Sequence, residues 1–494
     1  MLFNTLNFAI FLPIVFVFYW LFNNIFKKNE QYNLKLQNIL LLLASYFFYA
    51  SWDYRFLFLL IFSTFLDYFS GIKISDAKNK NTKKIWFWAS IGINLGFLGI
   101  FKYYNFFIGS FTEMLTLAGI KVDLWTLKII LPVGISFYTF HGLSYIIDIY
   151  KDRIKPERNF IDYAVFVSFF PLLVAGPIER ATHLLPQIKQ KRVFTYDNAV
   201  DGLRQILWGL FKKVVIADTC ATFVNVMFAQ NTQYQGILLV FGVVAFAVQI
   251  YCDFSGYSDI ALGVARLFGI TLLRNFNFPY FSRDIAEFWR KWHISLSSWF
   301  RDYLYIPLGG NRGTISMKIR NVLIVFLVSG FWHGANWTFI AWGMLHAIYI
   351  LPSIWLNTNR NNLDNHFDIV AQGKYFPTIK ELFSMIFTFA LVCFAWIFFR
   401  AESLTHAGNY ISHIFVADFF KMPFVATIPN KKIFSLIILL FFMIEWLGRE
   451  KQHPLENLNL KIAFLPVRWV SYMVLVALVF YFTGEKQQFI YFQF

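Results

Sequence analysis

Long apolar stretches recur along the whole chain, and they constrain its fold more than any other feature. A bilayer core of about 30 Å is crossed by a helix of roughly 20 mostly apolar residues. Backbone polar groups inside lipid must be satisfied within the segment, so such stretches form helices and not open sheets. We therefore predict an all-α polytopic membrane protein, with spans near residues 8–22, 39–69 (two helices), 85–100, 129–150, 237–251, 322–351, 382–399, 433–446 and 470–482.

The composition agrees with a membrane class. Hydrophobic residues make up 58% of the chain and charged residues only 15%, whereas soluble domains hold about 25% charged residues. Because no Lys or Arg precedes the first apolar run and no small-residue cleavage site follows it, we expect a retained helix and not a signal peptide. The three cysteines, Cys220, Cys252 and Cys393, are scattered in apolar surroundings and show no disulfide or metal spacing.

Basic loops predict which ends of the helices share a side of the membrane. Residues 73–84 hold five lysines against one aspartate, and residues 151–158 and 27–28 are also basic. Retention of positive loops in the cytoplasm and attraction to anionic lipid explain most of the net charge of +16. We expect these loops on the cytoplasmic side, the N-terminus outside, and no binding of nucleic acid.

For the loops to share a side, residues 85–119 have to count as one crossing, with a broken or interfacial part near residues 102–105. From 175 to 320 the hydrophobicity keeps breaking at Gly-Pro and basic positions. Segments too short to span suit re-entrant or interfacial helices around a polar cavity. We predict one membrane-embedded domain, residues 1–494, whose core of 170–347 carries the chemistry.

Ionisable side chains in apolar helices are costly, and by default they indicate function. His333 lies in the apolar run VSGFWHGANW (328–337), where Gly330, Gly334 and Ala335 permit close approach of a neighbouring backbone or a substrate. Histidine, with a pKa near 6.5, exchanges a proton at neutral pH. The alternative is a buried histidine that only bonds a neighbouring helix.

A second segment, FWRKWHISLS (288–297), places Trp289, Trp292 and His293 on one helical face. Arg290, Ser297 and Arg301 fall on adjacent rows, and Glu287 and Lys291 are spaced for an i,i+4 ion pair. A belt of aromatic and cationic residues at the membrane interface explains the Trp and Arg without function. It explains His293 less well.

Two further segments carry polar groups. Residues 249–259 (QIYCDFSGYSD) include Asp253 and Tyr257, which could line a cavity, orient a histidine or pair with Arg. Helix N-capping by Ser255 or Ser258 explains this segment equally well. The helix break AGPIER (175–180) is more readily explained as structural.

Several familiar sites are absent from the sequence. It contains no G-x-S-x-G elbow, H-E-x-x-H or paired C-x-x-C motif, P-loop or G-x-G-x-x-G fingerprint. A serine nucleophile or a metal site is therefore disfavoured, and histidine is the best candidate for handling a proton.

These motifs resemble the membrane-bound O-acyltransferase superfamily, in its bacterial alginate O-acetylation-like branch. The resemblance covers essentially the whole chain, and the segments that carry it are residues 131–150, 169–180, 251–270, 275–312 and 329–347. It implies about eleven spanning helices around a central funnel in the bacterial cytoplasmic (inner) membrane. It also implies that His333 is catalytic and that His293 is a second site residue.

The implied reaction moves an acyl group, most readily acetyl, from a cytoplasmic-side thioester to a hydroxyl of a cell-envelope or extracellular polysaccharide. The donor would be acetyl-CoA or an acyl carrier protein, a co-substrate and not a bound cofactor. An extracytoplasmic, esterase-like partner protein would often complete the transfer.

Roles for the remaining residues follow as hypotheses. We expect His333 to act as general base, with His293 or a Trp indole orienting the acceptor or the oxyanion. Arg290, Lys291 and Arg301 are candidates for the donor's phosphates. The residues expected to line the cavity or orient substrate are Trp292, Trp332, Asp253, Tyr257 and Ser297.

Three other functions stay open from the sequence. One is transfer of D-alanyl or another acyl group from a carrier protein to teichoic acid or peptidoglycan. Another is a secondary transporter or flippase, since broken helices and central polar groups suit one. The third is a scaffold for envelope-polymer machinery, which would tolerate loss of both histidines.

Overall fold

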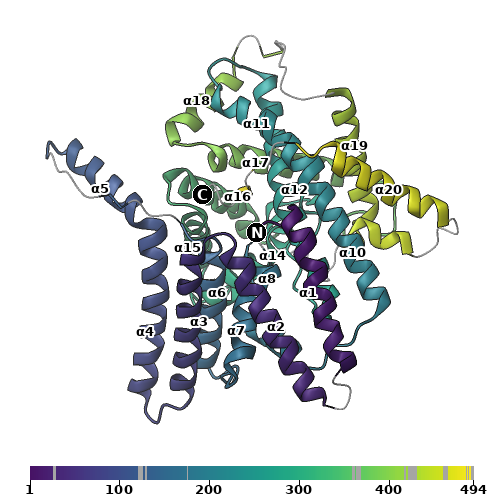
Figure 1. Ribbon diagram of the computed structural model, residues 1–494. Helices are drawn as coiled ribbons and strands as arrows, with labels where there is room; N and C mark the ends of the chain where they lie inside the picture. Colours follow the sequence, from purple (N-terminus) through teal and green to yellow (C-terminus); the bar gives the residue numbers. More distant parts are fainter. Residues whose placement is uncertain are drawn as a thin grey trace. The chain divides into compact units, whose positions relative to one another are not determined.

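The computed structural model describes residues 1–25, 29–120, 126–127, 131–174, 176–358, 362, 369–416, 419–420, 431–459, 465–484, 487 and 489–490. In these residues all regular structure is helical (Figure 1). Within this described part of the chain, six helices are long and apolar enough to cross a membrane, and three shorter apolar helices accompany them. The predicted all-α polytopic class is confirmed, whereas the expected number of about eleven spans stays a prediction.

Backbone contacts divide the chain into two compact units, residues 1–202 with 264–273 and residues 203–263 with 274–494. The prediction of a single domain with a core at 170–347 stays a prediction. The helices up to the division are α1 (Leu6–Ile25), α2 (Glu30–Ala50), α3 (Tyr54–Ser75), α4 (Lys80–Leu98), η1 (Gly99–Tyr103), α5 (Tyr104–Leu117), α6 (Ile135–Tyr150), α7 (Phe160–Ser168), α8 (Phe170–Leu173), α9 (Ala181–Lys189) and α10 (Tyr196–Leu210).

The later helices begin with the π-helical segment η2 that follows α10. They are η2 (Phe211–Ala217), α11 (Asp218–Ala229), α12 (Ile237–Leu267), η3 (Pro279–Phe281), α13 (Ile285–Lys291), α14 (Ile294–Phe300), η4 (Arg301–Tyr305), α15 (Ile315–His333), α16 (Trp337–Trp355), α17 (Ile379–Arg400), α18 (Leu404–Ile414), α19 (Lys431–Gly448), η5 (Pro454–Asn459) and α20 (Leu465–Tyr481).

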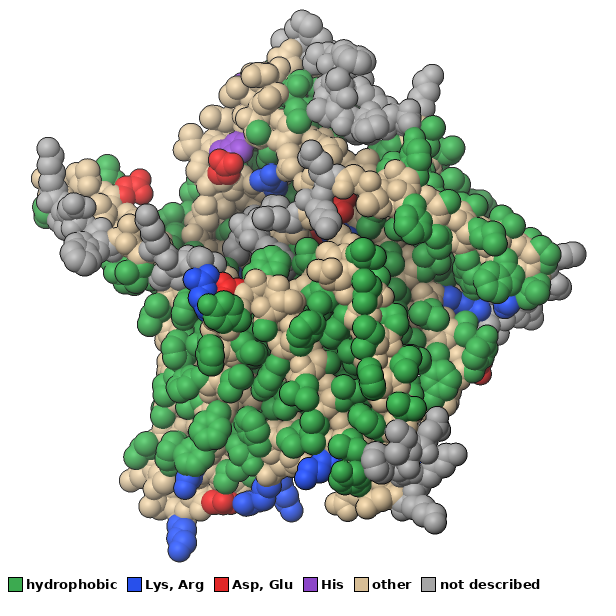
Figure 2. Space-filling view, in the orientation of Figure 1, with side chains coloured by type: hydrophobic (Ala, Val, Ile, Leu, Met, Phe, Trp, Pro, Cys, Tyr) green, Lys and Arg blue, Asp and Glu red, His purple; other side chains and the backbone are tan. Residues whose placement is uncertain are grey.

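In the first unit, α3 packs against both α4 and α6. Arg158 forms an ion pair with Asp76 at 2.7 Å, and Lys83 one with Asp152 at 2.9 Å. These contacts join the α3–α4 and α6–α7 loops, so the prediction that both loops share one side is confirmed. Figure 2 shows hydrophobic side chains over α2, α3 and α4 and Lys and Arg side chains at their lower end. The prediction for residues 27–28 lies outside the described residues.

A single helical segment contains most of residues 85–119, which were expected to cross the membrane once. It extends from Lys80 to Leu117, a length of 38 residues. A π-helical turn at Gly99–Tyr103 interrupts it, and α5 bends away from α4 beyond that turn (Figure 1). The predicted break near residues 102–105 is therefore confirmed.

The break after α8 is held by a buried carboxylate. Glu179, fully buried, accepts hydrogen bonds from the backbone N–H of Leu273 at 2.6 Å and contacts His183 Nδ1 at 2.7 Å. Its own backbone N–H donates to His141 Nε2 at 3.1 Å. This network favours the structural interpretation of residues 175–180, of which Ala175 lies outside the described residues.

The second unit contains the predicted short helices, α13 and α14, of seven residues each. It also contains α12 up to Gly263, and the 31 residues of this helix extend well beyond the predicted end at 251, so that boundary was wrong. The polar residues that follow 251 stay helical because η2 pairs with them inside the protein. Lys213 Nζ lies 2.7 Å from Asp253, and Lys212 Nζ donates to Ser255 Oγ at 2.9 Å.

Candidate active site

The helical hairpin of α15 and α16 positions His333. His333 is the last residue of α15, and the Asn336 side chain caps α16 by accepting the Thr338 backbone N–H at 3.0 Å. The two helices approach closely, since a Cβ on Gly330 would lie 2.3 Å from the backbone oxygen of Phe339. Close approach at Gly330, predicted from the sequence, is confirmed.

His293 occupies the sharp turn between α13 and α14. It stands at the N-cap of α14 with φ +44°, a left-handed conformation that few residues other than glycine adopt. The neighbouring backbone holds the turn, because Ile294 N–H donates to Asn275 O at 2.9 Å and Asn277 N–H to Lys291 O at 3.0 Å. The turn therefore replaces the single helical face that the sequence predicted for this segment.

Trp332 lies between the two predicted histidines. Its ring centroid is 6.2 Å from that of His293 and 4.9 Å from that of His333. All three residues are at least 94% buried, with exposures of 6% for Trp332, 1% for His293 and 5% for His333. The structure thus brings together residues that are 40 positions apart in the sequence.

A third histidine, which was not predicted from the sequence, continues this group. His346 of α16 is fully buried, and its ring is 5.0 Å from that of Trp342, which is in turn 5.0 Å from His333. The Nδ1 atom of His346 accepts a hydrogen bond from Trp289 Nε1 at 3.2 Å. The histidine cluster, as we call it, consists of His293, His333, His346, Trp289, Trp332 and Trp342.

Burial sets the protonation state of His293, which lies in a turn outside the candidate membrane spans. It lowers the pKa of His293 to about 3. The imidazole is therefore neutral at physiological pH, and it can accept a proton or take part in hydrogen bonds as a neutral ring. The edge of the Phe254 ring packs against it, with 4.7 Å between centroids.

A cavity of about 310 Å³ adjoins the cluster at Trp289. Three residues predicted for the site, Arg290, Ser297 and Arg301, line it. Arg301 is 63% exposed and pairs with the adjacent Asp302 at 2.8 Å. A cavity with guanidinium groups in its wall is suited to an anionic ligand.

Other predicted residues contribute elsewhere. Lys291 makes the expected ion pair with Glu287, at 2.6 Å, and this prediction is confirmed. Trp292 is buried in an aromatic core, with its ring 5.5 Å from Phe288 and 5.2 Å from Trp396. The side chains of Lys291 and Trp292 thus pack within the protein, and neither residue lines the 310 Å³ cavity.

Asp253 and Tyr257 lie on α12. Asp253 pairs with Lys213 at 2.7 Å and accepts the Ile490 backbone N–H at 2.8 Å, and the Tyr257 ring lies 4.7 Å from that of Phe489. Asp253 thus pairs with a lysine instead of the suggested arginine or histidine. The alternative that serines near 255–258 cap a helix is wrong, because both serines lie inside α12.

Within the described part of the chain, no group of three or more His, Cys, Asp and Glu side chains is placed to hold a metal ion. The chemistry available in the cluster is that of imidazole rings and indole N–H donors in a water-poor environment. Such groups can accept a proton and stabilise a developing negative charge.

The family model of the MBOAT, membrane-bound O-acyltransferase family, matches residues 150–368, a range that contains all three histidines. A probable alginate O-acetylase AlgI of Azotobacter vinelandii is 41% identical over 77% of this chain and 73% of its own length. The chain belongs to the membrane-bound O-acyltransferase family. The predicted family and enzyme class are thereby confirmed.

Two other relatives indicate the range of activities in this membrane-bound O-acyltransferase group. A peptidoglycan O-acetyltransferase of Helicobacter pylori is 38% identical over 82% of this chain and 78% of its own length. A teichoic acid D-alanyltransferase of Streptococcus thermophilus is 32% identical over 52% of this chain and 65% of its own length. Similarity is therefore more extensive to the O-acetylating relatives than to the D-alanylating one.

Proposed function

We propose that this chain transfers an acetyl group from a cytoplasmic-side thioester to a hydroxyl group of a cell-envelope polysaccharide. The observation that carries the proposal is the histidine cluster, buried and adjacent to a cavity that has guanidinium groups in its wall. Family membership supports acyl transfer to oxygen, and the relatives named for alginate and peptidoglycan O-acetylation support the acetyl group and the polysaccharide acceptor.

In the proposed reaction His333 acts as the general base. Its imidazole takes the proton of the acceptor hydroxyl as the hydroxyl oxygen attacks the thioester carbonyl carbon. The tetrahedral intermediate then collapses and the C–S bond breaks. The departing thiolate takes the proton back from the imidazolium, so the products are an acetyl ester and a free thiol. Burial strengthens these charge interactions by excluding water.

The other members of the cluster act on the acceptor and the oxyanion. The neutral ring of His293 orients the acceptor, and an indole N–H is suited to stabilise the oxyanion of the intermediate. His346 is a positioning residue, because it acts through Trp342 and Trp289.

Arg290 and Arg301 are proposed to bind the phosphates of coenzyme A. Both line the 310 Å³ cavity, and guanidinium groups bind phosphate through paired hydrogen bonds. Of the three residues predicted to bind the phosphates of the acyl donor, Lys291 is the weakest candidate, because its ammonium group already pairs with Glu287.

We place the enzyme in the bacterial cytoplasmic membrane, with an extracytoplasmic esterase-like protein as partner. The second candidate function is transfer of D-alanyl from a carrier protein to teichoic acid, which the Streptococcus relative supports more distantly. The two candidates differ in the donor, since one uses coenzyme A and the other a protein-bound pantetheine.

Purified protein in liposomes distinguishes these activities. Acetyl-CoA labelled in the acetyl group is enclosed in liposomes that carry the protein, and a polysaccharide acceptor and the partner protein are supplied outside. We expect labelled ester outside and free thiol inside, in equal amounts. Label that crosses as intact acetyl-CoA would instead indicate a transporter. Turnover with a D-alanyl carrier protein and none with acetyl-CoA would favour the second candidate.

A further inference from the structure

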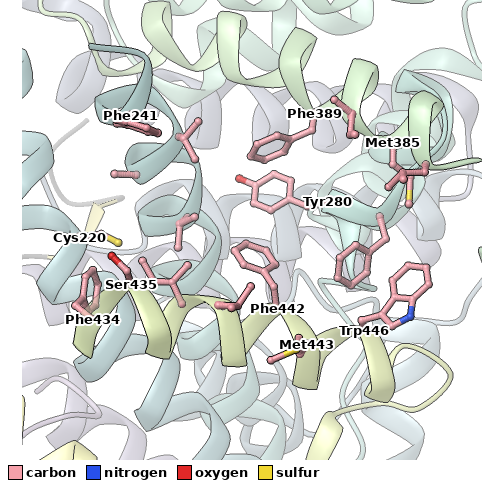
Figure 3. Close-up of a pocket in the computed structure, with 18 of the residues that line it drawn as sticks. Cys220, Phe241, Tyr280, Met385, Phe389, Phe434, Ser435, Phe442, Met443 and Trp446 are labelled. Carbon is pink, nitrogen blue, oxygen red and sulfur yellow. The ribbon is translucent and has the colours of Figure 1, made fainter. Parts of the chain in front are cut away.

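A second and larger cavity lies in the second unit and opens to its surface, since Phe376, Ile386 and Leu439 of its lining are 83%, 60% and 58% exposed. Its volume is about 1,240 Å³, and its walls come from α11, α12, η3, α17 and α19 and from residues 375–377. Figure 3 shows Cys220, Phe241 and Phe434 toward one end and Met385 and Trp446 toward the other. None of its described lining residues belongs to the histidine cluster or to the 310 Å³ cavity.

The walls of this cavity are suited to hydrocarbon and not to water. Tyr280 directs its hydroxyl to Ala247 O at 2.5 Å, and Trp446 directs its indole N–H to Tyr375 O at 2.8 Å. These donors are thus engaged with backbone oxygens, and most other lining side chains are aliphatic or aromatic. A bound water needs two to four polar partners, which such walls do not offer.

The size of the cavity indicates a long-chain occupant. Pockets for drug-sized ligands measure about 300–1,000 Å³, and this cavity exceeds that range. The cavity opens at exposed apolar side chains of α17 and α19, so it is expected to be accessible from the bilayer. The surrounding medium of a membrane protein supplies hydrocarbon chains.

The end of the cavity beside Trp446 carries positive charge. Arg449 holds the backbone there, because its guanidinium donates to the oxygens of Lys374 and Ala371, each at 2.6 Å. The Lys374 side chain is exposed, and so is that of Lys380 in the first turn of α17. Tyr375 and Phe376, 80% and 83% exposed, lie between these lysines, as aromatic residues do at a membrane interface.

Two carboxylates near the Trp446 end of the cavity accept hydrogen bonds from backbone N–H groups. Glu381 accepts from the Thr378 backbone N–H at 2.9 Å within a capping box, and Glu450 accepts from the Gly373 N–H at 2.7 Å. Their charges are thus partly balanced by hydrogen-bond donors, whereas the two lysines face outward.

We propose that this cavity binds the acyl chains of an anionic glycerophospholipid, with the phosphate between Lys374 and Lys380. A chain that leaves the bilayer for an apolar cavity gains no hydrophobic free energy, because both environments are equally apolar. Selectivity therefore comes from the headgroup charge and the shape of the cavity. The lipid is a resident ligand, and the proposal is independent of the acetyl-transfer reaction.

Native mass spectrometry of the protein purified in mild detergent tests this proposal. Wild type is expected to carry one phospholipid and, after delipidation, to rebind phosphatidylglycerol in preference to phosphatidylcholine. The double charge reversal Lys374→Glu/Lys380→Glu is expected to abolish that preference. The matched control Lys78→Glu/Lys80→Glu, on exposed lysines of the other unit, is expected to retain it.

A second variant tests the cavity itself. Val244→Trp places an indole in the cavity wall formed by α12, and loss of the bound lipid with retained monodispersity is expected. Absence of lipid from wild type would overturn the proposal. A polyprenyl phosphate as the bound species would also overturn it. The same holds if wild type, Lys374→Glu/Lys380→Glu and Val244→Trp all bind the lipid equally.

Discussion

The indole N–H of Trp289 donates a hydrogen bond to Nδ1 of His346, over 3.2 Å. Because an indole N–H can only donate, Nδ1 is the acceptor and the neutral ring carries its proton on Nε2. Trp289 also lines the 310 Å³ cavity. The Trp289 side chain thus connects the proposed coenzyme A site to the fully buried His346.

Trp289→Phe removes this donor and keeps an aromatic ring. Loss of a buried hydrogen bond costs about 1–3 kcal/mol, so we expect kcat to fall roughly 5- to 150-fold if the bond positions the cluster in the transition state. Steady-state thiol release measures kcat and KM separately. Trp86→Phe in α4 serves as the control and should leave both unchanged. An unchanged kcat for Trp289→Phe would show that the bond has no role in positioning.

His293 makes stability depend on pH. With its pKa lowered by burial to about 3 and an unfolded value near 6.5, only the unfolded chain binds this proton between those values. Stability therefore rises with pH from about 3 to 6.5 and is complete above that range, with a slope of about 1.4 kcal/mol per pH unit.

His293→Asn tests this dependence, since Asn tolerates the left-handed backbone that Ala does not. As the pH is lowered from 6.5 to 4.5, we expect the unfolding midpoint of wild type to fall more steeply than that of His293→Asn. His293→Ala should show the same loss of pH dependence with lower stability throughout. Parallel pH profiles of wild type and His293→Asn would contradict the assignment of a neutral buried histidine.

Gly343 allows α15 and α16 to approach closely. A Cβ at Gly343 would lie 2.3 Å from Phe326 O, so Gly343→Ala forces the helices apart and displaces Trp342 relative to His333. We expect a loss of about 1–3 kcal/mol in stability and a larger relative loss of activity. Gly96→Ala in α4, where a Cβ meets nothing within 4 Å, is the matched control. Wild-type activity in Gly343→Ala would contradict the role of this contact.

The buried pair of Lys213 and Asp253 is expected to stabilise the second unit. Asp253→Asn leaves Lys213 with Asp218 alone, at 2.8 Å, and removal of one partner of a buried pair costs about 3–5 kcal/mol. The double variant Lys213→Met/Asp253→Asn should recover part of this loss in unfolding measurements. The exposed pair of Lys83 and Asp152 provides the control, since Asp152→Asn is expected to cost at most about 1 kcal/mol. A double variant less stable than Asp253→Asn would contradict this assignment.

The long apolar helices and the shared loop ends were predictable because apolar length and basic charge are local properties of the sequence. The continuation of α12 was not, because its polar residues become compatible with a buried helix only through Lys212 and Lys213 of another segment. Asp253 was assigned to the site for the same reason, since its lysine partner is 40 positions away in the chain.

His346 could have been found from the sequence. It is an ionisable residue inside a 19-residue apolar helix, and such residues usually serve a function. By contrast, no sequence pattern shows that Trp289 would bond to it, because the turn at His293 sets the direction of α13. Of the residues predicted for the site, His293, Trp332 and His333 lie close together, whereas Asp253 instead pairs with Lys213.

The most direct test of the central claim is release of free thiol from acetyl-CoA, with a polysaccharide acceptor and the partner protein present. We compare wild type with His333→Ala, and verify the fold of the variant by its unfolding midpoint. Loss of at least 100-fold in thiol release from a folded variant, about 3 kcal/mol in transition-state free energy, is the result expected for a general base. Wild-type release from folded His333→Ala would contradict the proposed mechanism.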